Sequence, residues 1–179
     1  WTLESRGMEA DIEVRRDGSN GPVLTLDKFG PGMTRLAQRV VLTFPVEGVT
    51  FRGDINLSGT SAGANEGRSA LILRYEDANG VPLGASVWLD GSATATDLWG
   101  VAPLPLLGPT VSLRFADEGR QSLDLQLGRE LTEELPDIDM VAVRQITILL
   151  ALLGSDTCRP DDCRATLEAG RLAMTATAP

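Results

Sequence analysis

A chain of 179 residues with 42% hydrophobic and 23% charged residues has the composition of a folded globular protein and not of a disordered chain. Its formal net charge of −9 argues against nucleic acid and anionic membrane surfaces as partners, because both attract concentrated basic charge. The apolar run Ile146–Leu153 is far shorter than the roughly 20 residues of a transmembrane helix, so no membrane span is predicted.

Segments in which apolar and polar residues alternate recur along the chain. Period-two alternation predicts strands with one buried and one exposed face, and the clearest examples are 51–58, 71–76, 86–90, 111–115 and 123–127. Turn sequences rich in Asp, Asn and Gly separate them, and Asn79-Gly80 between two of them predicts a hairpin. Regularly spaced short strands predict an all-β fold, an antiparallel sandwich of two sheets that forms a single domain over 1–179.

The C-terminal third adds three elements. Residues 128–136 predict one short helix that Pro136 ends. The segment Ile146–Leu153 is apolar on both parities, so it is either a central strand covered on both sides or an edge strand that meets a partner. Residues 165–175 predict the final strand.

The two cysteines, Cys158 and Cys163, predict a short disulfide across a loop. A redox pair or a zinc site is the alternative, but both prefer two intervening residues, and zinc requires additional Cys or His ligands. The chain contains no His. A disulfide is typical of oxidising compartments, so the predicted location is periplasmic or extracellular.

The absence of His also removes the usual general base and excludes Ser-His-Asp and Cys-His catalysis. Carboxylates that could hydrolyse glycosides occur close together as Glu133-Glu134 and as Asp137 and Asp139, but a solvated helix face and its exit turn explain them better. No catalytic residue is predicted, and the chain is not expected to be an enzyme.

A structural calcium ion is a further candidate, because carboxylates and amide oxygens gather in two loops. The candidate ligands are Asp77 and Asn79 in one turn and Asp161 and Asp162 in the cysteine loop. Neither loop matches a complete calcium motif, and Asp and Asn in turns commonly bond their own backbone. No other cofactor is predicted.

Trp88 shares the polar parity of its segment with Ser86 and Asp90, whereas Val87 and Leu89 take the apolar parity. A tryptophan on the exposed face of a strand is a candidate platform for a sugar ring or an anchor in a protein interface. If the strands share one sheet, the polar side chains around it would be Arg52, Asp54, Asn56, Arg74 and Arg114. If they are divided between two sheets, or if a loop covers Trp88, no such site forms.

Five pieces of the sequence from about Val40 onward carry a family resemblance. They are 49–58, the hairpin 71–80, Trp99, 143–149 and the closing 167–172. Their order resembles the jelly-roll β-sandwich modules of the galactose-binding-like class, which includes many carbohydrate-binding modules. The resemblance implies two antiparallel sheets, often with a structural calcium. Members bind glycans, whereas the related complex I intermediate-associated proteins resemble assembly factors.

Aromatic residues make up only 4% of the chain, and glycan binders usually use several aromatic side chains. The sequence therefore favours a non-catalytic extracytoplasmic accessory or scaffold module that docks on a larger protein assembly through its sandwich surface or loops. The alternative is a carbohydrate-binding module that holds a glycan on its polar sheet face around Trp88. A weak enzyme is the third possibility.

Overall fold

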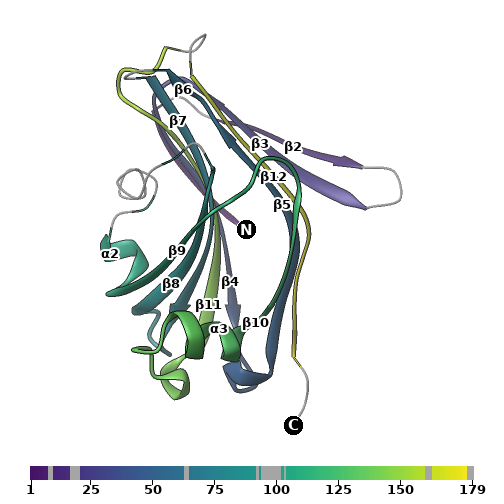
Figure 1. The fold of residues 1–179 in the computed structure, drawn as a ribbon, viewed down its shortest axis with the longest axis vertical. Helices are drawn as coiled ribbons and strands as arrows, with labels where there is room; N and C mark the ends of the chain where they lie inside the picture. Colours follow the sequence, from purple (N-terminus) through teal and green to yellow (C-terminus); the bar gives the residue numbers. More distant parts are fainter. Residues whose placement is uncertain are drawn as a thin grey trace.

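A computed structural model describes residues 1–7, 10–16, 21–62, 65–91, 93, 102, 104–159 and 163–176. Two β-sheets lie face to face (Figure 1). Sheet I has the strand order β1 (Thr2–Gly7), β4 (Gly32–Val41), β11 (Gln145–Gly154), β7 (Asn65–Glu76), β8 (Pro82–Leu89) and β9 (Thr110–Phe115), with β6 (Ser61–Ala62) beside β7. Sheet II has the order β10 (Gln121–Gln126), β5 (Val49–Gly59), β12 (Arg164–Ala176), β3 (Pro22–Phe29) and β2 (Ala10–Arg16).

The all-β sandwich is confirmed. Among the described strands every pairing is antiparallel except that of β8 with β9, which run parallel. A parallel neighbour requires a crossover instead of a tight turn, and the long connection after β8, which includes the short helix α2 (Leu104–Leu107), supplies it. The predicted hairpin joins β7 to β8, and Gly80 takes the positive φ of 79° that its turn requires.

The main core fills the space between the sheets. β11 is an internal strand of sheet I, paired with β4 on one side and β7 on the other. Its inward side chains, which are fully or nearly fully buried in this core, are Ile146, Ile148, Leu150 and Leu152. Of the two alternatives that the sequence left open for this apolar run, the central strand is confirmed and the edge strand that meets a partner is excluded.

A second core covers part of the outer face of sheet I. Leu107 of α2 and Ala102 before it lie over outward side chains of β7, β8 and β11, and all of these are buried: Ala70, Ile72, Ala85, Val87, Leu89, Leu149 and Ala151. We call the described residues 93, 102 and 104–107 the cover segment. Sheet I is thus buried on both faces over the middle of β7 and most of β8, which explains the uninterrupted apolar stretch 70–73 in β7.

The predicted short helix is confirmed as α3 (Leu127–Glu134). It lies at the lower end of the sandwich in Figure 1, with Leu127 and Leu131 in the main core. Two 3₁₀ turns, η2 (Val46–Gly48) and η4 (Met140–Ala142), lie at the same end. In the part of the chain that the structure describes, no helix has the length and apolar character needed to cross a membrane.

The predicted disulfide between Cys158 and Cys163 is also confirmed, with a Cα–Cα distance of 5.5 Å. Both cysteines are buried, and the bridge closes the loop between β11 and β12. It lies at the end of the strands opposite to α3.

Candidate functional site

Trp88 is not a binding platform. Only 4% of its surface is exposed, and its ring lies in the core between the two sheets. The prediction assigned the faces of β8 the wrong way round, because Val87 and Leu89 point outward, beneath the cover segment. A strand covered on both faces carries apolar residues on both parities, so alternation could not identify its inner face.

The polar side chains expected around Trp88 are divided between the sheets. Arg52, Asp54 and Asn56 lie on β5 in sheet II and pair with side chains of their own sheet. Three hydrogen bonds of 2.6–3.2 Å join the neighbours: Arg52 donates to Asp124, Ser122 to Asp54, and Asn56 to Glu168. The Ser122 hydroxyl and the Arg171 guanidinium, against the opposing effect of burial, lower the pKa of Asp54 below its ordinary value. These side chains form a cross-strand polar ladder on sheet II, and Asn56 also lines a pocket at the end of β5.

The Arg114 side chain points into the sandwich and forms hydrogen bonds with polar groups of the core. Its Nη1 and Nη2 donate to the two carboxylate oxygens of Glu130 on α3, at 2.7 and 2.9 Å. Ser86 donates to Glu130 Oε1 at 2.6 Å, and the Ser86 hydroxyl lies 3.2 Å from the hydroxyl of Tyr75. This network satisfies polar groups that would otherwise be buried without partners.

Arg74 lies in a groove that is separate from the pocket that Asn56 lines. The groove occupies the outer face of sheet I beside the cover segment and has a volume of about 510 Å³. Its described lining comes from β1, β4, β7, β11 and α2: Thr2, Glu4, Arg35, Ala37, Arg39, Arg74, Leu106, Thr147 and Leu149. Ala37 and Leu149 form its apolar floor on the sheet, Leu106 of the cover segment adds an apolar wall, and the other lining residues are polar.

Strand register explains why these side chains meet. On the three central strands, Arg39 of β4 lies opposite Thr147 of β11, which lies opposite Arg74 of β7. Two residues along the strands, where side chains return to the same face, Ala37 lies opposite Leu149. The outer face therefore carries a polar row next to a row of small and apolar residues.

Glu76 holds the polar row in place. Its side chain is completely buried beneath the groove, and its Oε1 accepts hydrogen bonds from Arg74 Nε at 2.6 Å and from Thr147 Oγ1 at 2.8 Å. Arg39 Nε lies 3.5 Å from Oε2, and this oxygen accepts no hydrogen bond from the described residues. Arg74 Nη1 also donates to the Leu106 carbonyl at 3.2 Å, which attaches the cover segment to the groove wall.

Arg35 forms the next part of the wall, on β4 opposite Glu4 of β1. Only 8% of Arg35 is exposed, and Glu4 Oε2 lies 3.9 Å from its Nη1. Burial lowers the pKa of Arg35; Glu4 opposes this effect, and the positive charges of Arg6 and Arg74 add to it. Burial and the positive charges of Arg6 and Arg74 therefore disfavour the charged form of Arg35, and Glu4 favours it.

Sequence reasoning did not single out Arg35, Arg39, Glu76 or Thr147. A signal was present in each strand, since Arg35 and Arg39 share one parity in β4, and Arg74 and Glu76 share one in β7. The groove depends on the order and register of four strands, which no single segment contains.

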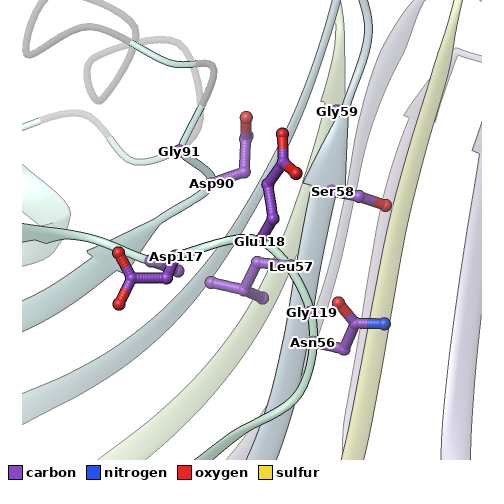
Figure 2. A pocket seen from close by; sticks show the side chains of 10 residues that line it. Asn56, Leu57, Ser58, Gly59, Asp90, Gly91, Asp117, Glu118 and Gly119 are labelled. Carbon is purple, nitrogen blue, oxygen red and sulfur yellow. The ribbon is translucent and has the colours of Figure 1, made fainter.

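A second pocket of about 460 Å³ lies between the end of β5 and the residues that follow β8 and β9 (Figure 2). Its acidic residues are Asp90, Asp117 and Glu118. Figure 2 shows the carboxylates of Asp90 and Glu118 directed the same way and that of Asp117 directed elsewhere. Asp90 is buried and accepts a hydrogen bond from the Ser69 amide at 2.9 Å, so it supports the backbone at this end of the sheet.

The calcium candidates are only partly described. Asp77 Oδ1 accepts hydrogen bonds from the backbone amides of Asn79 and Val81, both at 2.8 Å, and these bonds lower the pKa of Asp77. No group of three or more acidic or cysteine side chains arranged for a metal ion occurs among the described residues. Asp77 and Asn79 thus fit a turn better than an ion site. Asp161 and Asp162 lie outside the described residues, so calcium at that loop stays a prediction.

No family model matches the sequence, and no curated protein does either. Solved structures match the fold. The xyloglucanase domain of NopAA, a type three effector from Sinorhizobium fredii solved with cellobiose, aligns with a TM-score of 0.51 and 9% identity, over 99% of this chain and 93% of that chain. The chain has a jelly-roll β-sandwich fold.

Two further structures resemble the chain with lower scores. One is the enzymatically active domain of tailspike protein 4 from bacteriophage CBA120, with a TM-score of 0.49 and 10% identity over 99% of this chain. The other comes from a study of promiscuous carbohydrate-binding modules of the β-sandwich superfamily, with a TM-score of 0.47 and 10% identity over 97% of this chain. The chain spans 19% of the length of the first and 56% of the second.

Proposed function

We propose that the chain is a non-catalytic carbohydrate-binding module that holds a glycan in the groove on the outer face of sheet I. The observation that carries this proposal is the floor of Ala37 and Leu149 bordered by fixed hydrogen-bonding groups, in a volume of about 510 Å³. Sugar rings present flat apolar faces and a rim of hydroxyls, and a groove with this division of surfaces matches them. The jelly-roll fold, which carbohydrate-binding modules share, is consistent with the proposal.

Two observations favour this function over the others that the sequence allowed. The doubly apolar strand Ile146–Leu153 was one of the features that suggested docking, beside the low aromatic content and the lack of catalytic groups, and β11 proves to be an internal strand. A hydrolase needs two accessible carboxylates about the scissile bond, whereas the Glu76 carboxylate is completely buried beneath this groove. The disulfide supports a periplasmic or extracellular location.

The test is a binding assay with a panel of soluble plant, algal and bacterial polysaccharides in affinity gels, followed by calorimetry on those that retard the protein. Ala37→Tyr places a ring on the groove floor and is expected to abolish retardation. Ala173→Tyr makes the same change on an exposed position of β12 in sheet II and is the matched control. Retardation that survives Ala37→Tyr would place binding elsewhere, and release of reducing ends from a retained polysaccharide would contradict the non-catalytic assignment.

A further inference from the structure

The strand β2 forms one edge of sheet II. Among the strands that the structure describes it pairs with β3 alone, so half of its backbone amides and carbonyls point away from the sheet. In Figure 1, β2 and β3 extend beyond the other strands of sheet II toward the right, and the side chains of residues 11–15 are all exposed. Edge strands are usually protected from pairing by proline, lysine or a bulge. β2 contains neither proline nor lysine, and its register with β3 runs without a shift.

Two apolar side chains of β2 lie on the inner face of sheet II without being covered. Ile12 lies opposite Leu26, and Val14 lies opposite Leu24. Leu26 belongs to the main core and Leu24 packs against it, and residues directly opposite each other share a face. However, 41% of Ile12 and 66% of Val14 are exposed. A strand added at this edge would bring its own side chains beside them and remove apolar surface from water, which favours association.

The charges on the outer face of β2 match those of the same strand turned by 180°. Glu13 and Arg15 lie two positions apart, and their side chains are 59% and 63% exposed. A two-fold axis through Val14 places Glu13 opposite Arg15 of a second copy, and Arg15 opposite its Glu13. An axis through Glu13 would oppose two glutamates, and an axis through Ile12 would oppose Asp11 to Glu13. Like charges directly opposite each other are destabilising, so the axis through Val14 is favoured over these two.

We infer that the free edge of β2 pairs with the β2 edge of a second copy of this chain, antiparallel and about a two-fold axis at Val14. The pairing joins the sheet II of each copy into one continuous sheet. Val14 then lies beside Val14 of the second copy on the inner face, and two reciprocal pairs of Glu13 with Arg15 form on the outer face. The inference is independent of the proposed glycan binding, because the groove lies on the outer face of sheet I.

The edge strand of sheet I, β1, provides the comparison. Glu4 and Arg6 have the same spacing of opposite charges and lie 3.7 Å apart. The residue between them is the polar Ser5, whose hydroxyl lies 3.2 Å from the hydroxyl of Thr34. A two-fold axis at Ser5 would therefore bring no apolar pair together. For this reason the self-pairing is assigned to β2.

The test is sedimentation velocity of the intact chain at concentrations from about 1 to about 500 µM, because small interfaces associate weakly. A reversible equilibrium between monomer and dimer is expected. Val14→Lys should weaken the dimer about tenfold, because it replaces an apolar pair at the axis by two like charges. Val14 is largely exposed in the single chain, so the variant should keep its fold, which circular dichroism checks. A parent chain that stays monomeric throughout this range would overturn the inference.

An exchange of charges tests the register of the pairing. Glu13→Arg alone and Arg15→Glu alone each place like charges opposite each other, so each single variant should lose self-association. The double variant Glu13→Arg/Arg15→Glu opposes unlike charges again and should recover the dimer. An equimolar mixture of the two single variants should form a heterodimer, because one β2 is then basic and the other acidic on the outer face.

The matched control is Glu4→Arg, which makes the same change in the edge strand of sheet I and should leave the dimer intact. An equal loss in Glu4→Arg would place the contact at the wrong edge and overturn the inference. A dimer that both single variants at β2 leave unchanged, or a double variant that does not recover it, would overturn it as well. These measurements use no carbohydrate, so their failure leaves the proposed function standing, and a failure to bind glycans leaves the dimer standing.

Discussion

The guanidinium group of Arg114 lies 5.2 Å from the centroid of the Trp88 ring, inside the sandwich. The same guanidinium forms two hydrogen bonds with Glu130, so β8, β9 and α3 are joined by one partly buried contact. A cation over an indole face is favourable, and more so where water is excluded. Trp88 therefore stabilises the end of the sandwich where α3 lies, and it is too deeply buried to contact a ligand.

Trp88→Ala is expected to lower the free energy of unfolding by about 3–5 kcal/mol, the usual cost of removing a large buried aromatic side chain. Urea denaturation followed by circular dichroism measures this loss. Trp1→Ala is the control, because Trp1 is 53% exposed, and it should change stability by less than about 0.5 kcal/mol. A Trp88→Ala variant that is as stable as the parent would show that the ring is not packed as described.

Glu76→Gln is expected to cost about 3 kcal/mol of stability, although the two side chains have the same shape. The amide cannot compensate the charge of Arg74, which is 11% exposed in its side chain, and an unpaired buried charge is strongly unfavourable. Glu13→Gln removes one partner of the exposed pair with Arg15 and should cost far less than Glu76→Gln, because solvent screens exposed ion pairs. Similar losses in the two variants by urea denaturation would contradict a special role for Glu76.

Tyr75 is the only tyrosine in the chain, and burial raises its pKa well above the ordinary value of 10.0 against the smaller effect of its hydrogen bond with Ser86. The buried neutral phenol therefore stabilises the fold fully below pH 10.0, and this contribution is lost as the pH rises through the folded-state pKa. Tyrosinate absorbance at alkaline pH should appear together with the loss of β-sheet circular dichroism. Titration near the ordinary value with the fold intact would contradict the burial. Tyr75→Phe should lose this alkaline dependence.

Replacing both Cys158 and Cys163 by serine is expected to cost about 2 kcal/mol, because the bridge spans only five positions and a small loop gives a small entropic gain. Thermal unfolding of the variant, compared with the parent in the presence and absence of a reducing agent, measures this cost. The reducing agent should lower the midpoint of the parent and leave that of the variant unchanged. A parent that is insensitive to reduction would show that the bridge does not stabilise the fold.

The strands and the short helix could be predicted because their signals are local. Alternation marked 51–58 and 111–115, the Asn79-Gly80 pair marked the hairpin, and Pro136 bounded α3. The inner face of β8 could not be predicted, because the residues that bury Val87 and Leu89 from outside follow in the next connection. Local alternation contains no information about a cover of this kind.

The groove could not be predicted for a different reason. Its polar side chains come from three separate stretches of sequence, which become neighbours only through the register of β4, β11 and β7. They are Arg35 and Arg39 on β4, Thr147 on β11, and Arg74 and Glu76 on β7. A shift of one residue in either pairing would turn one set of side chains to the other face. The sequence predicted Arg74 as a binding residue but placed it beside Trp88. Trp88 lies on the opposite face of sheet I.

Arg74 lines the groove and also donates a hydrogen bond to the Leu106 carbonyl, so it links the groove to the cover segment that borders it. The width of the groove is therefore set by a connection between strands, while its floor is set by the sheet. Connections between strands tolerate changes of length and sequence that a sheet does not. Under the proposed function, relatives with the same sheet would acquire different ligand preferences through this one connection, and exchanging it between modules would alter specificity without disturbing the core.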